Sequence, residues 1–351
     1  MQKQIVNLNQ LLYMNHFKHL AIAALLALSA GSVTAKDHVD YVDPFIGTTN
    51  FSICNPGAIR PHGLMSVVPF NVMGSDLNQQ DKDSRWWSAV YEYNNKYFTG
   101  FAHVTLSGVG CPEMGTLLTM PTSGELNVDY RSYGSEYKDE TARPGYYSNV
   151  LTKYGIKCEV AATMRSSIER YTFPGGKSNL LFNLGNGLTN EIGASLRRVS
   201  DTEFEGTRLL GTFCYNPQAV FPMYFVVRVN KKPAAFGMWK KQPDLHNAQA
   251  QWDTYQGKYK LYPGYGRDMA GNDIGYYMTY DLAKGEQVEV QVGVSFVSIE
   301  GARANLNAEQ QGFNFDKTVA DTRAEWANTL NRISVEGGTD DQRRILYTAL
   351  Y

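Results

Sequence analysis

The sequence has almost no excess of charge of either sign. Its 351 residues include 33 lysines and arginines and 34 aspartates and glutamates, for a net charge of −1, and no sustained run of one sign occurs. Proteins that bind nucleic acid or anionic membranes through electrostatics carry a basic patch or stripe. We therefore expect no nucleic-acid partner and no attraction to an anionic membrane surface.

Long hydrophobic runs are scarce too. The clearest covers residues 20–28, follows a positively charged stretch, and is too short to span a bilayer. The small residues after it end in "VTA" at Ala35, which is typical of a signal-peptide cleavage site. We predict a signal peptide over residues 1–35, with Met14 as an alternative start, and a mature chain in the periplasm or outside the cell. No membrane span is expected.

Only four cysteines occur, and none forms a C-x-x-C pair: Cys54, Cys111, Cys158 and Cys214. A zinc site or a thiol redox centre is therefore a poor expectation. An exported protein can form disulfides, and four cysteines allow three pairings that spacing cannot separate. The alternative is that most of them are reduced and buried as small apolar side chains.

Motifs for metal binding and nucleophilic catalysis are missing as well. The histidines at 38, 62, 103 and 246 are scattered, and there is no H-x-x-x-H or EF-hand pattern. The segment around Ser107 lacks the G-x-S-x-G arrangement of a serine nucleophile. Spacing nominates no pair of carboxylates and no metal ligands, so we name no catalytic residue.

What the sequence does contain is a long succession of short β-rich runs between Tyr41 and about Ser298. They are separated by Gly, Pro, Asn and Asp, and several alternate apolar with polar residues. In the clearest, residues 287–299, Val288, Val290, Val292, Val294 and Phe296 share one face. Runs of this kind without intervening helices predict a mainly β fold, a large antiparallel β-sandwich over residues 36–300.

The pattern changes to a helical one after Glu300. Residues 301–338 contain Val319, Trp326, Leu330 and Ile333 at helical spacing and predict a helical linker that ends at "EGG". A further helix is expected over 339–351, because Thr339 is a good N-cap and Gln342 can complete a capping box. Ile345, Leu346, Ala349 and Leu350 form an apolar stripe on that helix.

Three segments contain candidate functional residues. "NPGAIRPHG" at 55–63 predicts a tight irregular loop, which can be simply a rigid turn. In "DSRWWSAVYEY" at 83–93, extended backbone would put one tryptophan on each face. An exposed indole suits the C–H face of a sugar ring, and the alternative is that the pair belongs to the core and an interface.

The third segment is "GFAHVTLSGVGCPEMG" at 100–115, whose four glycines indicate backbone that approaches something closely. Its polar candidates are His103, Ser107 and Glu113. His103 by itself is more often a hydrogen-bonded structural histidine than a base. The candidate substrate-binding residues are therefore Trp86, Trp87, His103 and Glu113.

Together these motifs resemble glycoside hydrolase family 92, the calcium-dependent exo-α-mannosidases. The blocks occur in the family's order across the mature chain: "YVDPFIGTTN", "NPGAIRPHGLMSVVPFN", "GFAHVTLSGVGCPEMGTLLTMP", "RPGYYSNVLTKYGIKCEVAATMRSSIERYTFP", "VGVSFVSIEGARANLNAE" and "RILYTALY".

The resemblance implies a β-sandwich followed by an (α/α)₆ barrel, with mannose removed with inversion in the cleft between them. It implies a Ca²⁺ cofactor, a mannose-containing glycan as substrate, and an acid, a base and metal ligands that come mostly from the barrel. Residues 339–351 would then be the first helix of a truncated barrel, whose remainder is missing from this chain. The family's tryptophan near the leaving-group subsite corresponds to Trp87 or Trp86.

The chain also departs from the family's pattern. It has Ala102, Val104 and Thr105 where the family often has Ser, Thr and His, so linkage preference could differ from the common α-1,2 specificity. Cys54–Asn55 replaces the usual apolar residue before Pro–Gly. Two other hypotheses stay open: a mannose-binding or scaffold module without catalysis, and an incomplete gene product that exposes the apolar stripe of its last helix.

Overall fold

The computed structural model describes residues 37–49, 53–72, 89–108, 110, 113–188, 193–211, 216, 218–241 and 258–351. From His38 onward the described residues belong to one unit. The predicted signal peptide with its cleavage site, the pair Trp86 and Trp87, and Cys111 and Cys214 lie outside the described residues. In the part of the chain that is described, no helix is long and apolar enough to cross a membrane.

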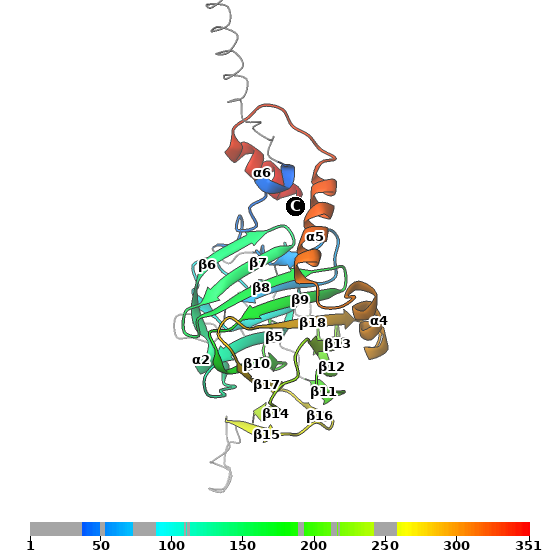
Figure 1. Cartoon of the computed structure of the whole chain (residues 1–351). Helices are drawn as coiled ribbons and strands as arrows, with labels where there is room; N and C mark the ends of the chain where they lie inside the picture. The colour runs from blue at the N-terminus through cyan, green and yellow to red at the C-terminus, as the bar shows by residue number, and fades with distance from the viewer. Residues whose placement is uncertain are drawn as a thin grey trace, which may run out of the picture. The chain divides into compact units, whose positions relative to one another are not determined.

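Two antiparallel sheets make up most of the described chain (Figure 1). One has eight described strands in the order β1 (Ala58–Ile59), β2 (Ser66–Phe70), β4 (Gly100–Thr105), β5 (Met114–Ser123), β10 (Gly176–Asn183), β17 (Ile274–Leu282), β14 (Ala235–Lys241) and β15 (Tyr259–Pro263). The other has ten described strands in the order β16 (Met269–Gly271), β11 (Ala194–Arg198), β12 (Glu203–Leu210), β13 (Phe221–Val229), β18 (Gln287–Ser295), β9 (Ser166–Thr172), β8 (Ile156–Ala162), β7 (Tyr146–Leu151), β6 (Ser135–Arg143) and β3 (Tyr97–Phe98). The prediction of a mainly β, antiparallel fold is confirmed.

Alternating apolar residues place one face of each sheet in a shared core. In β18, Val288, Val290, Val292 and Val294 are fully buried, as the alternation predicted, whereas Phe296 lies just beyond the strand and is partly buried. A β-strand turns successive side chains to opposite faces, so this period of two selects which residues meet the opposite sheet.

Aromatic rings join the two sheets across this core. The Phe204 ring of β12 stacks on Tyr276 of β17, with centroids 4.5 Å apart, and meets Phe182 of β10 edge to face at 4.8 Å. Both geometries suit the quadrupoles of aromatic rings. Phe204 is thus one of the places where the ten-stranded sheet is fixed against the eight-stranded one.

Five helical elements are described: η1 (His38–Tyr41), α2 (Tyr130–Tyr133), α4 (Ile299–Glu309), α5 (Phe315–Leu330) and α6 (Asp340–Leu350). The helix α4 lies directly on β18 because Gly293 has no side chain there; a Cβ at Gly293 would come within 2.6 Å of the Leu306 Cβ. In α5, Trp326 and Leu330 are buried as the helical spacing predicted. Ile333 follows the helix and is 48% exposed.

The last helix, α6, begins as the sequence predicted and packs differently. The Gln342 backbone N–H donates to Thr339 Oγ1 at 3.2 Å, and the Thr339 N–H donates to Gln342 Oε1 at 3.0 Å, which completes the capping box. Of the helix residues, only Tyr347 is buried, whereas Ile345 is 62% and Leu350 39% exposed. The predicted apolar stripe is therefore largely uncovered within the described chain.

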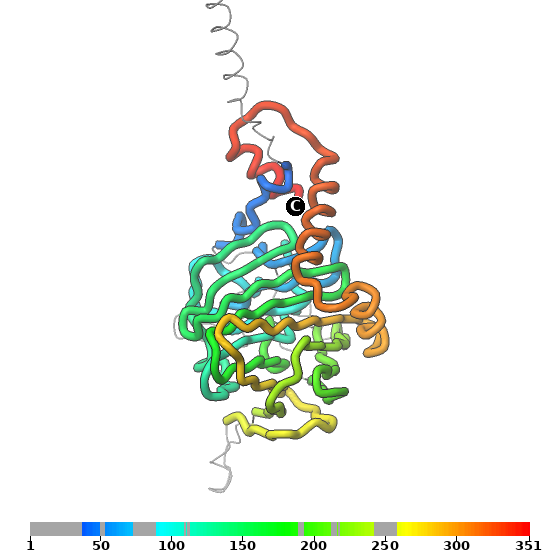
Figure 2. The backbone as a smooth tube through the Cα atoms, in the orientation of Figure 1, coloured from blue at the N-terminus to red at the C-terminus, as the bar shows by residue number. Residues whose placement is uncertain are grey.

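Tyr347 explains how α6 is held beside η1 although the two are about 300 residues apart in sequence (Figure 2). Its ring stacks on His38 with centroids 4.5 Å apart and an interplanar angle of 15°. Its hydroxyl donates to the Ile333 carbonyl oxygen at 3.2 Å. The same apolar cluster contains Trp326 and Leu330, so η1, α5 and α6 pack on one another.

Candidate functional site

A cavity of about 340 Å³ opens where the loop 54–63 meets α5 and α6. Ligand pockets for small molecules span roughly 300–1,000 Å³, so this one suits a group the size of a single sugar ring. Its lining comes from six parts of the chain: Pro44 and Ile46; Cys54, Asn55, Gly57, Ile59, Arg60, Pro61 and His62; Ser66 and Val68; Thr105 and Ser107; Trp326 and Thr329; Thr348, Leu350 and Tyr351.

The loop is fixed by close backbone packing, so the predicted tight loop both forms a rigid turn and lines the cavity. A Cβ at Gly57 would lie 2.4 Å from the Val67 carbonyl oxygen, which leaves no space for any other residue. The Gly63 N–H donates to the Arg60 carbonyl oxygen at 2.9 Å and closes a turn. His62 within that turn has φ 56°, a left-handed conformation that is uncommon for a residue with a side chain.

Two adjacent residues of α5 hold the loop against the helix. The Arg60 guanidinium pairs through Nε and Nη2 with both carboxylate oxygens of Glu325, a bidentate geometry, and this pairing raises the pKa of Arg60. The Trp326 Nε1–H donates to the Ile59 carbonyl oxygen at 2.7 Å. Because the side chains of Arg60 and Glu325 are 27% and 39% exposed, solvent screening keeps the ion pair's contribution to stability small.

The end of α6 completes the cavity wall. The Tyr351 ring lies 4.4 Å from the Trp326 ring at an angle of 51°, so the two form a continuous aromatic surface. The Asp43 N–H donates to Thr348 Oγ1 at 2.9 Å. This bond holds the segment that contains the lining residues Pro44 and Ile46 against α6. Trp326 and Tyr351 give the cavity an apolar side, while Ser66, Thr105 and Ser107 belong to its polar lining.

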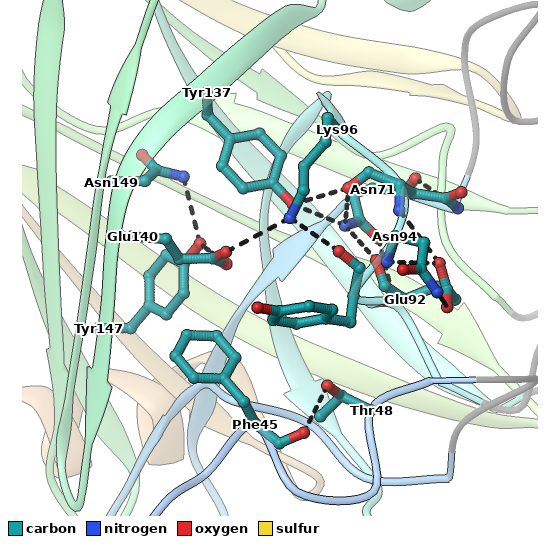
Figure 3. A network of polar contacts seen from close by, with 12 residues as sticks. Phe45, Thr48, Asn71, Glu92, Asn94, Lys96, Tyr137, Glu140, Tyr147 and Asn149 are labelled. Carbon is teal, nitrogen blue, oxygen red and sulfur yellow. Dashed lines mark hydrogen bonds and ion pairs between the residues drawn. The ribbon is translucent and has the colours of Figure 1, made fainter.

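A second polar network fixes the segment that follows the tryptophan pair (Figure 3). The Asn71 amide donates to the Glu92 carbonyl oxygen at 2.9 Å and to the Tyr137 hydroxyl at 2.9 Å. Tyr147 donates to Glu140 at 2.6 Å, and burial raises the pKa of Glu140. Neither Glu92 nor Glu140 lines the cavity, so this network supports neighbouring backbone.

His103 lies in the core, away from the cavity. It is fully buried on β4, where Nδ1 donates to the Leu117 carbonyl oxygen at 2.7 Å and Nε2 lies 2.7 Å from Glu169 Oε1. Glu169 also accepts from the Thr119 hydroxyl at 2.7 Å and from Tyr171. These contacts support the alternative of a hydrogen-bonded structural histidine, and a role for His103 in sugar binding stays a prediction.

The other candidate residues, Glu113, Ser107, Trp86 and Trp87, differ in what the structure says about them. Glu113 is 1% exposed and directly precedes β5, whose first two residues, Met114 and Gly115, both have positive φ. Ser107 lines the cavity. Trp86 and Trp87 lie outside the described residues, so their role stays a prediction. Sequence reasoning selected the loop and noted Asn55 as a departure from the family's pattern, but it nominated neither Asn55 nor Arg60 as a functional residue.

Among the cysteines, Cys158 is fully buried in the core, and burial raises the pKa of its thiol. Cys54 lines the cavity and is half-buried. Cys158 thus behaves as the small apolar residue that one alternative described. The pairing of the four cysteines stays open, because Cys111 and Cys214 are outside the described residues.

The lining contains no aspartate or glutamate among the described residues. No group of three His, Cys, Asp or Glu side chains in the described ranges could hold a metal ion. Calcium takes six to eight oxygen ligands, so the described residues do not fit the ion that the resemblance implies. The cavity can bind and orient a ligand.

Comparison with known proteins covers nearly all of the described unit. Residues 41–295 match the glycosyl hydrolase family 92 N-terminal domain, and residues 301–351 match the glycosyl hydrolase family 92 catalytic domain. A curated relative from Arthroderma benhamiae, described as an uncharacterized secreted glycosidase, is 25% identical over 342 residues, which is 90% of this chain and 41% of the relative.

Solved structures of family 92 proteins are also similar to this chain. A family 92 α-mannosidase from Bacteroides thetaiotaomicron has a TM-score of 0.76 and 25% identity, over 90% of this chain and 41% of that one. A family 92 glycosyl hydrolase named ccman5 has a TM-score of 0.74 and 28% identity, over 90% and 40%. This chain therefore spans about two fifths of the length of the relatives it matches. Because a family model covers most of its residues, the chain belongs to glycosyl hydrolase family 92.

Proposed function

We propose that this chain is the sugar-contacting N-terminal part of an inverting exo-α-mannosidase, periplasmic or secreted, that acts on α-1,2-linked mannose of glycans. The cavity supports this proposal. Its loop 54–63 lies in the segment that matches the family's N-terminal domain, and Trp326 and Tyr351 lie in the segment that matches its catalytic domain. Similarity to a solved α-mannosidase adds the substrate class.

The proposal assigns sugar binding and catalysis to two different parts of a protein. Inverting hydrolysis needs a carboxylic acid and a carboxylate base on opposite sides of the bond that breaks. The described lining has no carboxylate, which agrees with an acid, a base and most of the calcium ligands that come from the barrel domain of the proposed enzyme. This chain would hold the apolar face of the sugar against Trp326 and Tyr351, with Trp87 or Trp86 near the leaving group, and His103 and Glu113 supporting that side.

The exposed face of α6 supports a barrel domain as the partner. Ile345 and Leu350 are exposed on a helix that has a complete capping box and a buried anchor at Tyr347. Apolar residues at helical spacing on one face favour packing against further helices. In the proposed enzyme the next helices of the barrel would cover this face.

A second candidate function is a mannose-binding module without catalysis. The observation that favours it is the same lining, which offers an aromatic surface and hydroxyl groups and no described carboxylate. Binding would then be the whole activity of the chain.

Three measurements separate these functions. We expect no hydrolysis of an aryl α-mannoside by the 351-residue chain in the presence of calcium; turnover that a chelator abolishes would overturn the proposed division of work. Reading the DNA downstream of codon 351 in all frames should reveal a barrel with acidic cleft residues. If no frame encodes one, and calorimetry with α-mannobiose shows binding, the binding module replaces the enzyme.

A further inference from the structure

A buried pair of ionisable side chains joins the two sheets inside the core. His103 lies on β4 of the eight-stranded sheet and Glu169 on β9 of the ten-stranded sheet, and both side chains are fully buried. His103 Nε2 lies 2.7 Å from Glu169 Oε1, which is a hydrogen-bond distance. Neither residue lines the cavity, so contact with a ligand there does not explain why two ionisable groups are buried together.

The hydrogen bonds of the imidazole ring determine how many protons the pair holds. His103 Nδ1 lies 2.7 Å from the Leu117 carbonyl oxygen, which can only accept, so Nδ1 carries a hydrogen. A neutral ring would then present the lone pair of Nε2 to Glu169 Oε1, and two acceptors cannot form a hydrogen bond. One more proton is therefore needed between Nε2 and Oε1.

The other oxygen of Glu169 favours the ring as the site of that proton. Glu169 Oε2 accepts hydrogen bonds from the Thr119 hydroxyl at 2.7 Å and from the Tyr171 hydroxyl. Hydrogen bonds donated to a carboxylate stabilise its charged form. The contacts therefore describe an imidazolium at His103 that pairs with a carboxylate at Glu169.

The other titratable groups beside the pair are neutral near pH 7. Burial and the charge of Glu169 raise the pKa of Tyr171 on β9 and the pKa of Cys158 on β8. The residues paired with His103 on β2, and with Glu169 on β8 and β18, are all valines. Within the described ranges, His103 is thus the cation that pairs with Glu169. Loss of its proton would leave a buried carboxylate without a partner charge, which is strongly unfavourable.

We propose that the His103–Glu169 pair is a proton-dependent link between the two sheets, in which the folded core keeps His103 protonated at a pH where the unfolded chain does not. An unfolded histidine releases its proton above about pH 6.5. The folded protein then binds one proton more than the unfolded chain. The stability that this proton supplies is complete below about pH 6.5 and decreases as the pH rises. The proposal is independent of the proposed sugar-binding function.

The test compares urea unfolding of the wild-type 351-residue chain and of Glu169→Gln between about pH 6.5 and pH 8. The new amide can donate to Nε2 of a neutral ring and accept from the two hydroxyls, so this variant keeps the hydrogen bonds without the extra proton. One proton bound only by the folded state changes the unfolding equilibrium constant about tenfold per pH unit. The constant of the wild type should therefore rise with pH about tenfold per unit more steeply than that of Glu169→Gln.

A matched control is Glu159→Gln. Glu159 is also a buried carboxylate, on β8, but its partner is Arg170, a cation that does not titrate in this pH range. This variant should show the same pH slope as the wild type. Glu140 and Cys158, which also have raised pKa values, contribute equally to all three proteins and cancel in the comparison.

Nitrogen NMR of histidine-labelled protein locates the proton directly. In the folded wild type at about pH 8, both ring nitrogens of His103 should carry hydrogen, whereas in Glu169→Gln only Nδ1 should. A wild-type ring with hydrogen on one nitrogen alone at this pH would overturn the proposal, and so would equal pH slopes for the wild type and Glu169→Gln. If Glu169→Gln does not fold, the spectrum of the wild type decides by itself.

Discussion

Replacing Tyr347 with alanine should release α6 from the protein while the two sheets stay folded. Tyr347 is the buried residue of this helix; its ring stacks on His38 and its hydroxyl donates to the Ile333 carbonyl oxygen. An isolated helix of 11 residues is marginal in water, so α6 depends on this anchor. Loss of a buried aromatic side chain costs about 3–5 kcal/mol, and 3 kcal/mol corresponds to a change of roughly 100-fold in the docked population.

Hydrogen exchange measured by mass spectrometry checks this prediction. In Tyr347→Ala, peptides from 340–351 should lose their protection, whereas peptides from β18 at 287–295 should keep theirs. Tyr347→Phe removes only the hydroxyl and should cost about 0.5–1.5 kcal/mol. Ile345→Ala alters a side chain that is 62% exposed and should change stability by less than about 0.5 kcal/mol. If α6 in Tyr347→Ala exchanges as slowly as in the wild type, the anchor has been misassigned.

Three further predictions concern the loop and the buried carboxyl group. Arg60→Leu should lower the free energy of unfolding in urea by less than about 1 kcal/mol, because its ion pair with Glu325 is partly exposed; a loss above 2 kcal/mol would contradict this. Gly57→Ala should cost about 1–3 kcal/mol, since its Cβ would overlap backbone on β2, whereas Gly110→Ala has open space and should change stability by less than about 0.5 kcal/mol. Burial raises the folded-state pKa of Glu140, so the folded protein binds this proton more tightly than the unfolded one, and stability should fall as pH rises above about 4.3 toward the raised pKa. Urea unfolding of Glu140→Gln should lack that component of the decrease, and an unchanged pH profile would count against it.

Local patterns in the sequence predicted local structure well. The alternation of valines placed the inward face of β18, and the residues of the capping box placed the start of α6. Both signals depend on neighbours a few residues apart, where the geometry of a strand or helix leaves few alternatives. The family resemblance, which the comparisons confirmed, rests on several such blocks in a fixed order.

Contacts between distant segments were not predictable in this way. Arg60 and Glu325 are 265 residues apart, and His103 and Glu169 are 66 apart. No periodicity connects such pairs, because they meet only after the strand order of each sheet has formed. The sequence therefore selected the loop around Arg60 and could not say which helix would hold it. It also favoured a structural role for His103 but could not name Glu169 as its partner.

The residues that hold the cavity wall together are different from those that form the core between the two sheets. The core between the sheets depends on strand faces such as that of Phe204, which contribute nothing to the cavity wall. The wall depends instead on three ties: Arg60 to Glu325, the Trp326 N–H to Ile59, and the Asp43 N–H to Thr348. Since all three join the segments that line the cavity before β2 to α5 or α6, a change that displaces these helices should alter ligand binding before it affects the stability of the sheets. If the proposed sugar-binding function is correct, changes in sugar specificity would therefore involve the helices and the loop and leave the β fold unchanged.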